Sequence, residues 1–183
     1  MKISDKWANG IFAIATGSRF RRNLMTPLGF VMFLVFITCF VLLSDFLDSI
    51  LKLPFFPGRP LNLVIGIPVL SAGTILALTC VIFFLINKGT PVPLNPPPVL
   101  IDKGPYAYSR NPMIAGLLLV FFGYGILSGS ISLAFIITPL FAVFNVIELK
   151  RIEEPELEKR LGEAYLEYKK KVPMFFPAPG KRA

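Results

Sequence analysis

Three consecutive residues, Arg110, Asn111 and Pro112, could bind an anion at the start of a helix. Free amides at a helix N-terminus attract a carboxylate or phosphate, and an adjacent arginine adds a planar cation suited to either group. The residues also have a purely structural interpretation. Asn favours the position before a helix and Pro its first turn, while an interfacial arginine extends toward lipid headgroups. Spacing alone favours the structural interpretation, and both stay open.

Two adjacent acids, Glu153 and Glu154, precede Pro155 and could supply carboxylates to a site. Acids in the first turn of a helix also simply complement its dipole. Apolar residues then recur at spacings of three and four, which predicts an amphipathic helix along the membrane surface. These residues are Leu157, Leu161, Tyr165, Tyr168 and Val172. Such a stripe is more often packing than chemistry.

The chain has no histidine, so proton transfer near neutral pH would need a carboxylate. Its two cysteines, Cys39 and Cys80, both fall inside apolar runs. Disulfide frameworks belong to small secreted domains, so we interpret these thiols as inert packing. No metal site is predicted.

The composition favours a lipid bilayer as the solvent of this chain. Hydrophobic residues make up 54% and charged residues 16% of the 183 residues, against about a quarter charged in soluble domains. The net charge of +8 could indicate nucleic acid. However, the basic residues flank the apolar runs, as topology signals do, so no nucleic-acid partner is predicted.

The apolar runs predict an all-α integral membrane protein with about four transmembrane helices, an N-terminal interfacial helix and a C-terminal amphipathic helix. The four runs are Leu28 to about Leu53, Leu63–Ile86, Met113–Leu127 and Ile131–Ile147. The last two run lengths are short for a hydrocarbon core of about 30 Å, and Ser128-Gly129-Ser130 predicts a tight turn between them. One domain results, with an interfacial N-terminus (1–27), two spans (28–86), a cytoplasmic proline-rich loop (87–112), a helical hairpin (113–147) and a cytoplasmic C-terminal segment (148–183).

Charge asymmetry orients the spans. Of the 19 Lys and Arg residues, 17 fall before the first span, between the second and third, or after the fourth. Only Lys52 and Arg59 lie on the other side. Both termini are therefore expected in the cytoplasm, at the inner membrane of a prokaryote or the endoplasmic reticulum of a eukaryote. The loop, which six prolines within Gly89–Pro105 should make stiff and extended, then faces the same side as the C-terminal segment.

Taken together, these segments resemble a known family. The motifs, in order, are Gly104-Pro105-Tyr106-x-x-x-Arg110-x-Pro112, the apolar hairpin, Glu153-Glu154-x-x-Leu157, and Leu161-Gly162-x-x-Tyr165-x-x-Tyr168-x-x-x-Val172-Pro173. This order is similar to that of isoprenylcysteine carboxyl methyltransferases, and related phospholipid N-methyltransferases share much of it. The resemblance covers roughly Gly89–Pro177, about half of the chain.

The resemblance implies a helical membrane enzyme that binds S-adenosylmethionine between the loop, the hairpin and the C-terminal segment. A lipophilic or lipidated substrate would enter from the bilayer. By position, the candidate catalytic residues are Arg110, Glu153 and Glu154, and the candidate cofactor-binding residues are Tyr106, Arg110, Asn111, Pro112, Glu153, Glu154, Tyr165 and Tyr168. The chain departs from the family at Asn111, where members often have His, and at Ile114, where an aromatic residue is common.

Methyl transfer from a sulfonium is an in-line displacement that depends on positioning and on shielding from water. A carboxylate acceptor is already anionic and needs no base, whereas an ammonium must first lose a proton. The absence of histidine therefore favours an oxygen or sulfur acceptor. Two alternatives stay open: an NADPH-dependent membrane reductase of the sterol-reductase type, and a non-catalytic lipid-binding protein. We interpret Lys169–Lys171 as a solvated run facing headgroups and not as a site for the 2′-phosphate.

The predicted topology can be tested with reporter fusions. Reporters placed after Leu53 and after Gly129 should report the outer side, and one after Lys103 the inner side. An outer-side signal at Lys103 would contradict the predicted topology and separate the two halves of the proposed site.

Overall fold

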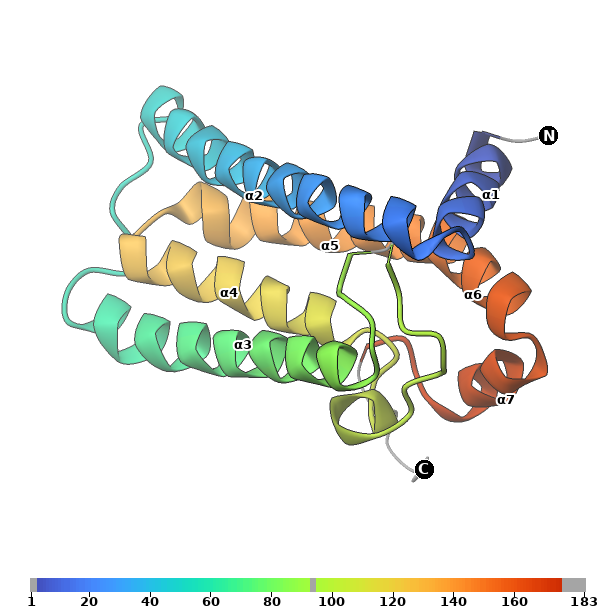
Figure 1. The fold of residues 1–183 in the computed structure, drawn as a ribbon. Helices are drawn as coiled ribbons and strands as arrows, with labels where there is room; N and C mark the ends of the chain where they lie inside the picture. The colour runs from blue at the N-terminus through green and yellow to red at the C-terminus, as the bar shows by residue number, and fades with distance from the viewer. Residues whose placement is uncertain (1–2, 93–94, 176–183) are drawn as a thin grey trace. The chain divides into compact units, whose positions relative to one another are not determined.

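The structure is a computed structural model that describes residues 3–92 and 95–175. Within these ranges every regular element is helical (Figure 1). The elements are α1 (Ile3–Ala15), α2 (Arg19–Ile50), α3 (Leu61–Ile86), the 3₁₀-helix η1 (Gly104–Ala107), α4 (Pro112–Ser128), the π-helix η2 (Ser132–Ile137), α5 (Thr138–Glu148), the π-helix η3 (Leu149–Glu153), α6 (Glu154–Leu161) and α7 (Glu163–Lys171).

Three helices of the described chain are long and apolar enough to cross a membrane. They are Thr26–Ile50 within α2, Leu61–Ile86, and the continuous helix Ser132–Leu161. The fourth predicted span, α4, is apolar but has 17 residues, so at about 1.5 Å per residue it falls slightly short of a hydrocarbon core. The all-helical membrane class is thus supported, and four as the number of spans stays a prediction.

Two boundaries differ from the prediction. The first long helix begins at Arg19 and includes the basic residues expected in the interfacial segment. The C-terminal amphipathic helix is not one helix, because Gly162 interrupts it with φ +59° and ψ −137°, a conformation that only glycine adopts without strain. The glycine at this position could have indicated the break, but the regular spacing of the apolar residues on both sides concealed it.

The chain divides into two compact units. The bundle unit contains residues 32–78 and 113–145, and the loop unit contains residues 1–31, 79–112 and 146–183. The bundle unit comprises parts of α2, α3, α4 and α5, and the loop unit holds every candidate site residue.

In the bundle unit, α3 and α4 lie side by side with their backbones almost in contact (Figure 1). Glycines recur seven residues apart on both helices, at Gly66 and Gly73 and at Gly116 and Gly123. A Cβ on Gly73 would lie 2.7 Å from the carbonyl oxygen of Gly116, and one on Gly123 would lie 2.5 Å from the nitrogen of Leu70. Close approach of small residues is how helices associate in lipid, where the hydrophobic effect gives no attraction between them.

The other half of the bundle unit is held by aromatic rings. Phe121 and Phe141 are buried and meet edge to face, with ring centroids 5.0 Å apart. Phe40 of α2 contacts both, at 6.2 Å and 5.7 Å. Leu133 and Ile137 complete this buried cluster. Edge-to-face pairs add about 0.5–1.5 kcal/mol each to the burial of their surface, and they fix α4 and α5 against α2.

The predicted turn between the last two apolar runs is confirmed. Gly129 has φ +74°, and the nitrogens of Gly129 and Ser130 donate to the carbonyls of Ile126 and Gly125 at 3.2 and 2.8 Å, which is a glycine-terminated helix end. Asp48 of α2 then caps the following helix: its carboxylate accepts from the Ser130 hydroxyl and, at 2.9 Å, from the Ser132 nitrogen.

The glycine contacts make a stability prediction. Gly73→Ala should destabilise the protein by about 1–3 kcal/mol, because its Cβ has backbone neighbours that cannot move aside independently. Gly10→Ala in α1 is the matched control: no atom lies within 4 Å of its Cβ, and alanine is the better helix former. Thermal unfolding in detergent should show a lower midpoint for Gly73→Ala only. Equal midpoints for both variants would contradict the α3–α4 packing.

Candidate functional site

The proline-rich loop is fixed at both ends by glycines that pack against rings. A Cβ on Gly89 would lie 2.3 Å from the nitrogen of Pro97, and Gly104, at φ +60°, packs onto the ring of Phe83. Between them the loop does not keep the extended course that its prolines predict. The nitrogen of Thr90 donates to the carbonyl of Asn95 at 2.8 Å, so the loop folds back on itself. Pro93 and Leu94 lie outside the described residues.

Tyr106 anchors the loop to the end of α3. Its ring is buried and meets the ring of Phe84 edge to face at 5.7 Å. Its hydroxyl forms a hydrogen bond with the thiol of Cys80, which is fully buried. Cys80 is therefore a packing residue, as predicted, with the additional task of positioning Tyr106. Cys39 is free and exposed on α2.

The loop then pairs with the C-terminal segment, in what we call the clasp (residues 109–111 and 173–174). The nitrogens of Arg110 and Asn111 donate to the carbonyls of Pro173 and Met174 at 2.9 and 3.1 Å. The Met174 carbonyl also accepts from the Ser109 hydroxyl and from the Asn111 side-chain amide, both at 3.1 Å. Pro112 follows as the first residue of α4, which confirms that a helix starts at this position.

Arg110 and Glu154 form an ion pair across this junction. Nη1 of Arg110 lies 2.5 Å from Oε1 of Glu154, and the two side chains are only 10% and 7% exposed. The other oxygen of Glu154 lies 2.6 Å from Nζ of Lys169, which also contacts Glu158 at 2.8 Å. The interpretation of Lys169 as part of a solvated run is therefore wrong. Lys170 and Lys171 are exposed, as that interpretation expected.

Arg110 has N–H donors that its ion pair with Glu154 does not use. Its Nε is buried and has no hydrogen-bond partner in the described part of the chain. The hydroxyl of Tyr165 is within hydrogen-bonding reach of the guanidinium. A buried N–H without an acceptor is costly, and it is the kind of group that a bound carboxylate satisfies.

Glu153 ends the π-helix η3, whose wider turn was not predicted. Its hydrogen bonds join residues five apart, so this turn brings Glu148 and Glu153 onto one face, whereas an α-helical turn would separate them. Glu148 repels Glu153 electrostatically and Arg160 attracts it, and neither acid forms a salt bridge with a described residue. Single π-turns occur frequently at functional sites. Glu148 was not predicted to be a site residue, because an acid directly after an apolar run is also expected at the boundary of a membrane span.

The three candidate tyrosines are neutral hydroxyls. Burial raises the pKa of Tyr165 to about 12 despite the nearby Arg110, and burial likewise raises the pKa values of Tyr106 and Tyr168. None can act as a base near neutral pH. Tyr165 and Tyr168 also form a buried apolar cluster with Val172, against which Leu100, Leu157 and Leu161 pack. The predicted stripe is thus packing, and the hydroxyl of Tyr168 donates to the carbonyl of Tyr106 at 2.7 Å.

The model of one protein family, described as phospholipid methyltransferase, matches residues 61–164, more than half of the chain. The chain belongs to the phospholipid methyltransferase family. Isoprenylcysteine carboxyl methyltransferase-like proteins are members of the same family, so the resemblance seen in the sequence is confirmed. No curated protein and no solved structure matches the chain.

The phospholipid methyltransferase match includes Tyr106, the clasp residues Arg110 and Asn111, and both acids Glu153 and Glu154. It ends before Tyr165 and Tyr168 and begins after α1 and α2. Methyltransferases of this family generally use S-adenosylmethionine. The network of Arg110, Glu154 and Lys169 thus joins the family segment to Lys169 of α7, which lies beyond the end of the match.

The Arg110–Glu154 pair makes a stability prediction. Glu154→Gln should cost about 3–5 kcal/mol, because it leaves Arg110 in a buried position without its anionic partner. Glu167→Gln is the control, since the pair of Glu167 with Lys170 is exposed and should change the unfolding midpoint little. Thermal unfolding in detergent measures both variants. A Glu154→Gln midpoint equal to that of Glu167→Gln would show that the buried pair is absent in the folded protein.

Proposed function

We propose that this protein is an S-adenosylmethionine-dependent methyltransferase that acts on a lipophilic acceptor at an oxygen or sulfur atom. The observation that carries the proposal is the buried Arg110 with an unused Nε, within a segment that the methyltransferase family model matches. S-adenosylmethionine supplies an electrophilic methyl group on a sulfonium. The chain's own residues would bind it, exclude water and orient the acceptor.

The residues present fit the polar groups of this cofactor. Arg110 offers free N–H donors for the amino-acid carboxylate, because its pairing with Glu154 uses only one side of the guanidinium fork. Glu148 and Glu153 offer two acids without a salt bridge to any described residue, and a cationic group or a hydroxyl-rich ribose suits such acids. In this proposal Glu154 positions Arg110 rather than contacting the cofactor.

The neighbouring residues would shape the site and exclude water from it. Tyr106, Tyr165 and Tyr168 are each at most 7% exposed, and the clasp holds Asn111 and Pro112 beside them. Aromatic faces attract a sulfonium as they attract other cations. Because the tyrosines stay protonated, an acceptor that arrives as an anion fits this site best, and Glu153 is the carboxylate that an ammonium acceptor would require.

Ligand binding distinguishes the proposal from its alternatives. S-adenosylhomocysteine at about 100 times its dissociation constant should stabilise the protein by about 2.7 kcal/mol, read as a raised midpoint in detergent. NADPH should not. A shift with NADPH alone would favour the reductase, and no shift with either would favour the lipid-binding protein.

The site assignment has its own test. Arg110→Lys keeps the charge that faces Glu154 but removes the planar fork, so it should weaken S-adenosylhomocysteine binding at least about 10-fold. Lys170→Ala, on the exposed side of α7, should bind as the parent does. If Arg110→Lys and Glu153→Gln both bind like the parent, these residues do not form the cofactor site even though the family is right.

A further inference from the structure

The carboxylate of Glu154 binds two cations at once. Its Oε1 contacts Arg110, and its Oε2 lies 2.6 Å from Nζ of Lys169. No other cation in the described part of the chain forms a salt bridge with Glu154. Because each oxygen has its own cation, the carboxylate is held in one orientation, and the guanidinium of Arg110 is oriented by it in turn.

Lys169 brings a full positive charge to this contact. It lies in the last turn of α7, where the helix dipole favours a cation. Its Nζ is also 2.8 Å from Oε1 of Glu158, and the two side chains are 35% and 37% exposed. Hydrogen bonds to Glu154 and Glu158 raise the pKa of Lys169, so the amine stays protonated across the neutral range.

This charge changes the balance around Arg110. Arg110 and Glu154 carry opposite charges, so the pair alone attracts an anionic ligand only weakly, even though the buried Nε of Arg110 has no partner in the described chain. Lys169 offsets the charge of Glu154 and leaves that of Arg110 in excess. Glu158 cancels this effect only in part, because its side chain is much more exposed than that of Glu154 and water screens it.

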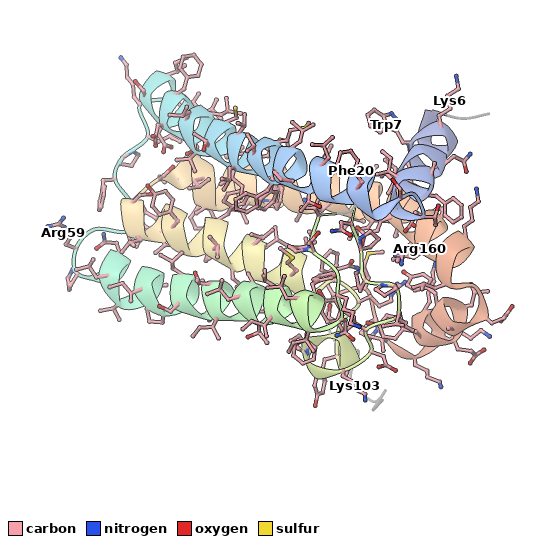
Figure 2. The ribbon with its side chains drawn as sticks, viewed as in Figure 1. Lys6, Trp7, Phe20, Arg59, Lys103 and Arg160 are labelled. Carbon is pink, nitrogen blue, oxygen red and sulfur yellow. The ribbon has the colours of Figure 1, made fainter. Side chains whose placement is uncertain are left out.

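Other cations of the loop unit are placed elsewhere and cannot take over this task. Arg160 of α6 donates to Glu156 at 2.8 Å and to the carbonyl of Pro97 at 2.9 Å. Figure 2 shows Lys103 at the edge of the loop unit, away from Arg160, and its side chain is exposed. The second oxygen of Glu154 therefore depends on Lys169.

We propose that Lys169 is a positioning residue of the cofactor site, which through Glu154 orients Arg110 and keeps it attractive to a ligand carboxylate. This inference rests on the proposed function. Lys169 acts through Glu154 and touches neither the cofactor nor the acceptor. The site thereby extends to α7, beyond residue 164, where the family match ends. The helix contributes charge to ligand binding in addition to the packing of Tyr165 and Tyr168.

The experiment measures the affinity of the full chain in detergent for S-adenosylhomocysteine by isothermal titration calorimetry. Lys169→Met removes the charge and should weaken binding about 10-fold, whereas Lys169→Arg keeps the charge and should bind close to the parent. Lys170→Met is the matched control, because Lys170 lies in the same turn but pairs with the exposed Glu167, and it should bind as the parent does. Parental affinity in Lys169→Met would overturn the proposal.

Glu158→Gln separates this role from mechanical support. The variant breaks the ion pair between Glu158 and Lys169 that ties α6 to α7, but it leaves the charge of Lys169 to Glu154 alone. It should bind S-adenosylhomocysteine at least as tightly as the parent. Weaker binding by both Glu158→Gln and Lys169→Met would show a structural tie and overturn the proposal. If the parent itself does not bind, the proposed function fails and this inference with it, whereas equal binding by parent and Lys169→Met refutes this inference alone.

Discussion

The carboxylate of Glu154 is the contact on which the loop unit depends. It receives Arg110 from the end of the loop on one oxygen and Lys169 from α7 on the other. Three segments distant in sequence thus meet at one anion. Attraction between charges grows as water is excluded, so the buried clusters around Tyr106 and Tyr165 strengthen this contact. Conversely, the pair orders the clasp, because Arg110 is also bonded through its backbone to Pro173.

Much of the fold follows from local patterns. Apolar length predicted the helices, Ser128-Gly129-Ser130 predicted the turn, and Pro112 predicted the start of α4, because each rests on interactions between near neighbours in the chain. The break at Gly162 and the two π-turns were not predicted. Gly162 allows the break by its own backbone freedom, but regular apolar spacing concealed it, and π-turns are too rare for a sequence pattern to predict.

For the candidate site too, the sequence predicted residues but not the contacts between residues that are distant in the chain. Sequence named Arg110, Glu153 and Glu154 through a family resemblance, but it could not say which acid pairs with which cation. Lys169 looked solvated because Lys170 and Lys171 follow it, yet helical periodicity turns one lysine of three inward. Glu148 and Arg160 belong to none of the motifs. Glu148 is positioned by the wider turn of η3, and Arg160 by its hydrogen bond to the proline-rich loop.

Charge balance along the last long helix leaves two acids without a salt bridge to a described residue. Five acids lie between Glu148 and Glu158. Glu154 and Glu158 are offset by Arg110 and Lys169, and Glu156 is offset by Arg160. Glu153 is repelled by Glu148, which the π-turn places on the same face, and by Glu156, and it is attracted by Arg160. A negative charge without a partner is unfavourable in such a position, and a bound cation would relieve that cost. In the proposed function, these two acids are therefore the place where the positively charged part of the cofactor would bind.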